Sequence, residues 1–114
     1  MKKIEFKNVR PYQAPKHFAC STLKLHGKEE SDCQKFWSGL THFLPGGGAE
    51  PDASPVEKMY IVLDGEVTIT NAAKERFVLR KWDSIHIGAN EQREILNETN
   101  YPASMLVVIN YPEA

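Results

Sequence analysis

Hydrophobic positions recur with a period of two along most of the chain, which is the side-chain period of a β-strand. Short runs rich in β-branched and aromatic residues occupy positions 18–26, 36–44, 60–63, 67–70, 76–80, 84–87, 93–96 and 104–110. Turn-forming residues separate many of these runs at intervals of about 8–12 positions, as in a β-sandwich or small barrel. The pattern predicts an all-β fold, and the one weak helix signal lies at 28–35.

Two clusters of turn residues interrupt this pattern. Pro45-Gly46-Gly47-Gly48 follows the run 36–44. We expect the strand to end there, because a strand interior does not tolerate such a sequence. Asp64-Gly65 stands between the runs 60–63 and 67–70, and this pair predicts a tight type I′ hairpin between them.

The runs 59–63 and 105–109 are apolar at every position. A half-exposed antiparallel strand should instead alternate between apolar and polar residues. Because large apolar patches are rarely exposed on monomers, something must cover the second face. A second copy of the chain is the simplest cover, so we expect a homodimer. The alternative is an N-terminal segment folded over its own barrel.

Composition and charge exclude several classes of partner. The 114 residues make one domain, with 14 Lys and Arg against 15 Asp and Glu and a net charge of -1. No basic field is present to hold nucleic acid. The longest apolar runs have five residues, whereas a membrane span needs about 20, and MKKIEFKNVR lacks the apolar stretch of a signal peptide. The two cysteines, Cys20 and Cys33, fit a reducing compartment, so we expect a cytoplasmic protein.

From Pro45 to the C-terminus the chain resembles the cupin superfamily of small double-stranded β-helix, or jelly-roll, barrels. The first cupin motif reads Gly, five residues, His-x-His, three or four residues, Glu, six residues, Gly. Here the same spacing holds Gly46, Asp52, Ser54, Lys58 and Gly65.

The second cupin motif reads Gly, five residues, Pro-x-Gly, two residues, His, three residues, Asn. This spacing runs from Trp82 to Asn97, and only Asn97 keeps the identity of the motif. Sixteen residues separate the two motifs, near the short end of the family's range. The resemblance implies a single cupin barrel, with an N-terminal arm at 1–35 and the barrel core at 36–110.

The chain departs from the family at the metal ligands. Cupins bind a divalent metal through two His and one Glu of the first motif and one His of the second. The corresponding residues here are Asp52, Ser54, Lys58 and Arg93. Lysine and arginine are cationic donors that repel a metal ion. We therefore expect neither a metal nor another cofactor.

By strand alternation, Lys58, Tyr60 and Val62 share one face of a strand, and Arg93, Ile95 and Asn97 share one face of another. The resemblance implies that both faces point into the barrel, where Asp52, Lys58 and Arg93 give a net charge of +1, suited to a small anionic metabolite. We predict catalytic roles for Lys58, Asp52 and Tyr60, and substrate-binding roles for Arg93, Ser54, Asn97 and Met105.

The predicted roles follow from the chemistry of each group. Arg93 can grip a carboxylate with two parallel hydrogen bonds. Lys58 can act as acid, base or electrostatic stabiliser, Asp52 as base or orienting group, and Tyr60 as proton donor to an enolate. Such a set fits a metal-independent isomerase, lyase or decarboxylase.

Three alternatives remain open at this stage. The pocket could serve a non-catalytic binding or sensing module, or the chain could be a metallo-cupin with atypical ligands, acting as a dioxygenase or isomerase. A third possibility is that Lys58 and Arg93 pair with Asp52, Glu57 or Glu94, which would plug the barrel.

The histidines add no site of their own. His42 and His86 are the two that could approach a barrel, and we expect His86 to face away from the interior because it lies between Ile85 and Ile87. His17 and His26 have no partner at a useful spacing.

Overall fold

The computed structural model describes residues 1–112, and its regular secondary structure is almost entirely β-strand. In chain order the elements are η1 (Phe6–Asn8), β1 (Arg10–Pro11), β2 (His17–His26), α1 (Lys28–Ser31), β3 (Phe36–Asp52), β4 (Lys58–Asp64), β5 (Val67–Asn71), β6 (Arg76–Leu79), β7 (Ser84–Ile87), β8 (Arg93–Leu96) and β9 (Ala103–Asn110). The predicted all-β fold is confirmed, and the weak helix signal corresponds to the single turn of α1.

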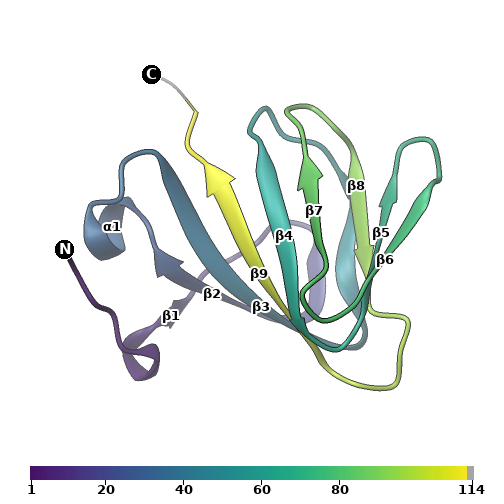
Figure 1. Ribbon diagram of the computed structural model, residues 1–114, viewed down its shortest axis with the longest axis horizontal. Coiled ribbons are helices and arrows are strands. Elements are labelled where there is room, and N and C mark those ends of the chain that lie inside the picture. The colour runs from purple at the N-terminus through teal and green to yellow at the C-terminus, as the bar shows by residue number, and fades with distance from the viewer. Residues whose placement is uncertain (113–114) are drawn as a thin grey trace.

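The strands form an antiparallel barrel that is nearly closed (Figure 1). The order of hydrogen-bonded strands is β6-β5-β8-β3-β9-β4-β7, with β2 along β3 and β1 along β2. The long strand β3 pairs with β9 over its first half and with β8 near its end, so it belongs to both facing layers. The edge strands β6 and β7 have no mutual ladder, which leaves the barrel open on that side.

Strand alternation decides which side chains form the core. On β4 the buried positions are Lys58, Tyr60 and Val62, with 6%, 3% and 0% of their surface exposed. On β8 they are Arg93 and Ile95. The structure confirms that these predicted faces point inward, so two basic side chains lie inside the barrel.

The prediction that a strand ends at Pro45 is wrong, because β3 continues through the three glycines to Asp52. The strand changes neighbours there, from β9 to β8, and the backbones come too close for side chains. A Cβ on Gly48 would lie 1.9 Å from the carbonyl oxygen of Ile95, and one on Gly47 would lie 2.2 Å from that of Ala19. The glycines therefore permit a corner within the strand.

The predicted hairpin at Asp64-Gly65 is also wrong. β4 pairs with β7 and β9, whereas β5 pairs with β6 and β8, so the turn crosses from one layer to the other. Gly65 has a φ of +78°, and a Cβ there would lie 2.7 Å from the carbonyl oxygen of Pro102. Gly65 permits both this turn and the close approach of the β8–β9 connection. Neither feature requires that β4 and β5 pair with each other.

All four glycine positions of the two resembled motifs have left-handed backbone. Gly46 and Gly65 have φ values of 81° and 78°, and Trp82 and Asn90, which replace glycine in the second motif, have φ values of 70° and 65°. Such a conformation is unusual for a non-glycine residue, above all for a bulky one. Trp82 and Asn90 therefore adopt a conformation that favours glycine, at the positions where the cupin motif has glycine.

The N-terminal strands extend the sheet at its edge, and Met59 on the outer face of β4 remains 46% exposed. An apolar row crosses this outer face in register, from β2 to β4, through Leu23, Leu40, Leu106 and Ile61. We call this row, with Met59 and Val108, the outer apolar face. Among the described residues, no helix is long and apolar enough to cross a membrane.

Gly48→Ala should destabilise the fold strongly. The added methyl group must displace backbone of β8, and such overpacking costs about 3 kcal/mol. Gly46→Ala is the matched control, because nothing lies within 4 Å of a Cβ there and only the left-handed backbone opposes it, at a cost of about 1 kcal/mol. Chemical denaturation measures both free energies of unfolding, and equal losses would contradict the proposed corner.

Candidate functional site

A pocket of about 150 Å³ lies inside the barrel, and we call it the inner pocket. Six of the seven predicted site residues line it: Asp52, Ser54, Lys58, Tyr60, Arg93 and Met105. The remaining lining residues are Tyr12, Ala14, Pro15, His17, Trp37, Thr41, Ile95, Val107 and Ile109. One part of the wall is thus polar and cationic, and the rest is largely apolar.

Arg93 and Lys58 reach the inner pocket from different strands. Arg93 on β8 is directly opposite Asp52 on β3, and Lys58 on β4 is opposite Ile109 on β9. Both basic residues are almost fully buried, with 7% and 6% of their surface exposed. Burial of a charged group costs free energy unless partners compensate it, so their partners decide what the pocket can bind.

Few of the donors on the two basic groups are used. Arg93 Nε donates to the Tyr60 hydroxyl at 2.9 Å, and Nη1 donates to the Glu50 carbonyl oxygen at 3.0 Å. A guanidinium has five N–H donors, so three remain without an acceptor among the described residues. Lys58 Nζ donates to Ser54 Oγ at 3.0 Å, which leaves two of its three donors.

The internal salt bridge that would plug the barrel is not formed. Within residues 1–112, neither Lys58 nor Arg93 has a carboxylate oxygen within ion-pair distance. Asp52 pairs instead with Lys16, at 3.4 Å between Nζ and Oδ1. Glu57 pairs with His86 on the outside of the barrel. The pocket therefore keeps two positive groups without a direct carboxylate partner.

The environment shifts the pKa values of the three predicted catalytic groups, Lys58, Asp52 and Tyr60. Burial lowers the pKa of Lys58, and the charge of Arg93 lowers it further, against the opposing effect of Asp52. The hydrogen bond from Lys16 holds the pKa of Asp52 below its usual value, so this carboxyl stays ionised. Burial raises the pKa of Tyr60, although Arg93 opposes that shift. Tyr60 therefore keeps its proton and can donate a hydrogen bond.

Asn97 was predicted to bind substrate, but it lies outside the inner pocket. Its amide nitrogen donates to the carbonyl oxygens of Phe43, Leu44 and Tyr101, and its oxygen accepts from Thr99. The side chain is fully buried and has no donor left for a ligand. Asn97 ties the β8–β9 connection to β3, which is a structural role.

The residues at the family's metal positions do not fit a divalent cation. Lys58 and Arg93 offer only cationic donors, and Ser54 already accepts from Lys58. Among residues 1–112, no three His, Cys, Asp or Glu side chains come together as a ligand set. The two cationic side chains instead give this part of the pocket a positive charge.

Sequence reasoning missed the part of the pocket that the N-terminal segment contributes. His17 lines the inner pocket although no spacing pointed to it, whereas His42 contacts Ser104 and His86 faces outward as predicted. Tyr12 packs edge-on against Trp37, with ring centroids 5.3 Å apart. The pairing of β2 with β3 brings this segment in, and that register leaves no local signal in the sequence.

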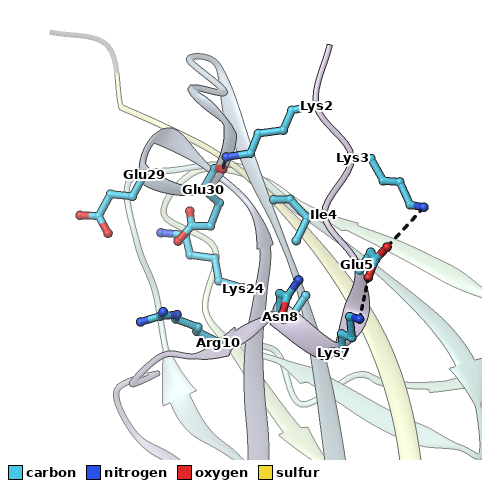
Figure 2. A pocket seen from close by; sticks show the side chains of 11 residues that line it. Lys2, Lys3, Ile4, Glu5, Lys7, Asn8, Arg10, Lys24, Glu29 and Glu30 are labelled. Carbon is cyan, nitrogen blue, oxygen red and sulfur yellow. Dashed lines mark hydrogen bonds and ion pairs between the residues drawn. The ribbon is translucent and has the colours of Figure 1, made fainter.

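A larger hollow of about 840 Å³ lies outside the barrel, beside the N-terminal arm (Figure 2). Its lysines are largely engaged: Figure 2 shows Glu5 between Lys3 and Lys7, and Lys2 donates to the Glu30 carbonyl oxygen. Exposed ion pairs of this kind contribute little free energy, because water and salt screen their charges. The smaller inner pocket, where the positive groups are buried, is therefore the stronger candidate site.

Comparison with known proteins supports the fold and identifies relatives of the chain. The chain is 42% identical over 103 residues to a protein of Mycobacterium tuberculosis named β-D-galactosidase Rv1717, a match that covers 90% of this chain and 88% of that protein. Among solved structures, the polyketide cyclase RemF of Streptomyces resistomycificus superposes with a TM-score of 0.85 at 18% identity, covering 96% of this chain and 79% of RemF.

A second similar structure is a cupin-superfamily sugar phosphate isomerase of Silicibacter pomeroyi, with a TM-score of 0.79 at 16% identity. That match covers 97% of this chain and 76% of the isomerase. These structural likenesses establish the fold and no activity. Residues 39–109 match the family Cupin_2, the cupin domain, and the chain therefore belongs to the cupin family.

Proposed function

We propose that the inner pocket binds a small anionic metabolite of carboxylate type, without a metal ion. The observation that carries this proposal is the pair of buried basic groups, whose free donors have no acceptor in the described chain. A carboxylate offers two acceptor oxygens and a negative charge, and it matches the guanidinium fork in geometry. Bound there, it would also offset the burial cost of both cations.

The pocket volume limits the size of this ligand. A cavity of about 150 Å³ is comparable to one that holds a benzene molecule, which has six heavy atoms. A short carboxylic acid therefore fits, whereas a disaccharide would require the wall to open. The apolar wall at Trp37, Val107 and Ile109 favours a ligand with a hydrocarbon part beside its charged group.

Each pocket group has a role in this proposal. Arg93 holds the carboxylate through Nη1 and Nη2, because Nε already donates to Tyr60. Lys58 supplies a second positive contact, and its ammonium form becomes more favourable once an anion neutralises the pocket. Tyr60 accepts from Arg93 and so keeps its own hydrogen for a ligand oxygen. These roles suit a metal-independent isomerase, lyase or decarboxylase.

Short carboxylates should raise the melting temperature of the protein, and their amides should not. At ten times Kd, a ligand that binds only the native state stabilises it by about 1.4 kcal/mol, equivalent to a shift of about 5 °C for a chain of this size. Lys58→Met and Arg93→Met should each abolish the shift, whereas the exposed control Lys81→Met should retain it. Equal shifts in all three variants would place the ligand elsewhere and refute the proposal.

Hydrolysis of a β-galactoside is a second candidate, because a relative at 42% identity carries that name. Glycosidases typically place two carboxyl groups about 5–9.5 Å apart across the scissile bond. Among the described residues that line the inner pocket, only Asp52 has a carboxyl group, and Lys16 holds it ionised. The site therefore lacks a carboxylic acid to protonate a leaving group.

A colorimetric assay with 4-nitrophenyl β-D-galactopyranoside separates the two candidates. We expect the wild type and Asp52→Asn to hydrolyse it equally slowly, at the background rate. If the wild type turns it over and Asp52→Asn loses at least a hundredfold in kcat, the pocket is a glycosidase site, and the carboxylate proposal is wrong.

We also propose that the protein is a homodimer formed through the outer apolar face. Its central row, Leu23 to Ile61, runs across four adjacent strands, and its rim carries both the Glu57 carboxylate and the His86 imidazole. An apolar centre whose rim carries both a carboxylate and an imidazole is complementary to a second copy of itself, as a two-fold interface requires.

Light scattering coupled to size exclusion tests this proposal. The wild type should run at twice the chain mass of 12.9 kDa, and Leu106→Glu should run as a folded monomer, because it buries a charge in the interface. Val78→Glu, which changes an apolar residue on the opposite layer, should remain dimeric. A monomeric wild type would contradict the proposed interface.

A further inference from the structure

His17 enters the inner pocket from outside the residues that match the family. The match covers residues 39–109, whereas His17 begins β2 and pairs with Ala49 on β3. This register brings the imidazole into the same lining as Lys58, Tyr60 and Arg93. The pocket therefore contains a titratable nitrogen base that neither cupin motif supplies.

A backbone contact sets the tautomer of His17. Its Nδ1 lies 2.8 Å from the carbonyl oxygen of Pro15. Because a carbonyl oxygen only accepts, Nδ1 must carry the hydrogen, and in the neutral ring the lone pair is on Nε2. Nε2 has no hydrogen-bond partner within residues 1–112. It is therefore available to accept a proton from a ligand.

The backbone around His17 is held in an unfavoured conformation. Lys16 and Ala19, neither of which is glycine, have φ values of 62° and 48°. Such conformations persist where the surrounding structure enforces them, and they cluster at functional sites. Here the Glu50 amide donates to the Lys16 carbonyl oxygen at 3.0 Å, and the Lys16 side chain pairs with Asp52. Lys16, which directly precedes His17, is thus fixed against β3 through both its backbone and its side chain.

The environment of His17, burial above all, lowers the pKa of its ring and so favours the neutral form. Burial lowers the pKa of His17, and Arg93 on β8 lowers it further. The hydrogen bond to Pro15 and the carboxylate of Asp52 on β3 act in the opposite direction without reversing the shift. Lys58 on β4 is a further positive group in the lining, and Tyr12 and Tyr60 add phenols. The ring is therefore unprotonated at neutral pH, as a general base must be.

We propose that His17 is the general base of the inner pocket, and that its substrate is a 2-oxo carboxylate from which it removes a C3 proton. This inference rests on the proposed carboxylate pocket. A 2-oxo acid carries a carboxylate next to a carbonyl oxygen, and the pocket offers the Arg93 fork next to the donors of Lys58 and Tyr60. Pyruvate, with six heavy atoms, matches the pocket volume.

The proposed step needs no redox partner. His17 Nε2 forms a bond to the C3 proton, and the electron pair of the C3–H bond becomes the C2=C3 double bond of an enolate. The carbonyl π pair moves to the C2 oxygen, which the Tyr60 hydroxyl and the Lys58 ammonium stabilise by hydrogen bonds. In D2O the imidazolium exchanges this proton for a deuteron from solvent. Transfer of the deuteron to C3, with return of the electron pair from the C2 oxygen, regenerates the keto acid with deuterium in place of hydrogen.

Proton NMR of pyruvate in D2O tests the inference directly. The wild type should exchange the methyl protons faster than buffer alone, and His17→Gln should lose at least a hundredfold of this rate while it keeps the pyruvate-induced rise in melting temperature. His42→Gln, on the outer face, should exchange like the wild type. The rate should rise with pH through the ring pKa that NMR measures for His17, because only the neutral ring accepts a proton.

The possible failures can be told apart. Pyruvate binding without exchange in the wild type would refute the general base and leave the carboxylate pocket as a binding module. Undiminished exchange in His17→Gln would assign the base to another group and overturn this inference alone. If no short carboxylate, pyruvate included, shifts the melting temperature, the proposed function fails, and this inference fails with it.

Discussion

Two buried basic side chains without a carboxylate partner are the constraint on which the functional account depends. A barrel of this size could bury apolar residues in their place at lower cost, since an uncompensated buried cation destabilises the folded state. Lys58 and Arg93 nevertheless lie inside, and the nearest acidic side chain of the pocket, Asp52, is engaged by Lys16. An anionic ligand would supply the compensating negative charge. The two basic groups, which destabilise the folded protein on their own, would then stabilise the complex with the ligand.

Two backbone features help to position these cations: the glycine corner in β3 and the residues with left-handed backbone. The corner in β3 lets one strand serve both layers, so Asp52 at its end stands opposite Arg93. Trp82 and Asn90 have left-handed backbone at positions where the family motif has glycine. The family's architecture has thus been retained, while its four ligand positions have changed from three imidazoles and one carboxylate to a carboxylate, a hydroxyl, an ammonium and a guanidinium.

Much of this arrangement could be predicted from the sequence, because strand alternation and motif spacing are local properties. They placed Lys58, Tyr60 and Arg93 on inward faces, and the structure confirms this. Strand pairing is not local: Asp64-Gly65 resembles a hairpin turn but joins the two layers. His17 reaches the pocket only through the register of β2 on β3. The side-chain amide of Asn97 donates its hydrogen bonds to carbonyl oxygens that are distant in sequence.

Titration of the Lys58 ammonium by nitrogen-15 NMR tests the central claim most directly. In the free protein the account predicts a pKa below the ordinary lysine value, because burial and Arg93 disfavour the charged form. Saturation with acetate should raise that pKa, whereas acetamide should leave it unchanged. A Lys58 pKa that is ordinary in the free protein and indifferent to acetate would contradict the account, since the barrel would then hold no uncompensated positive charge.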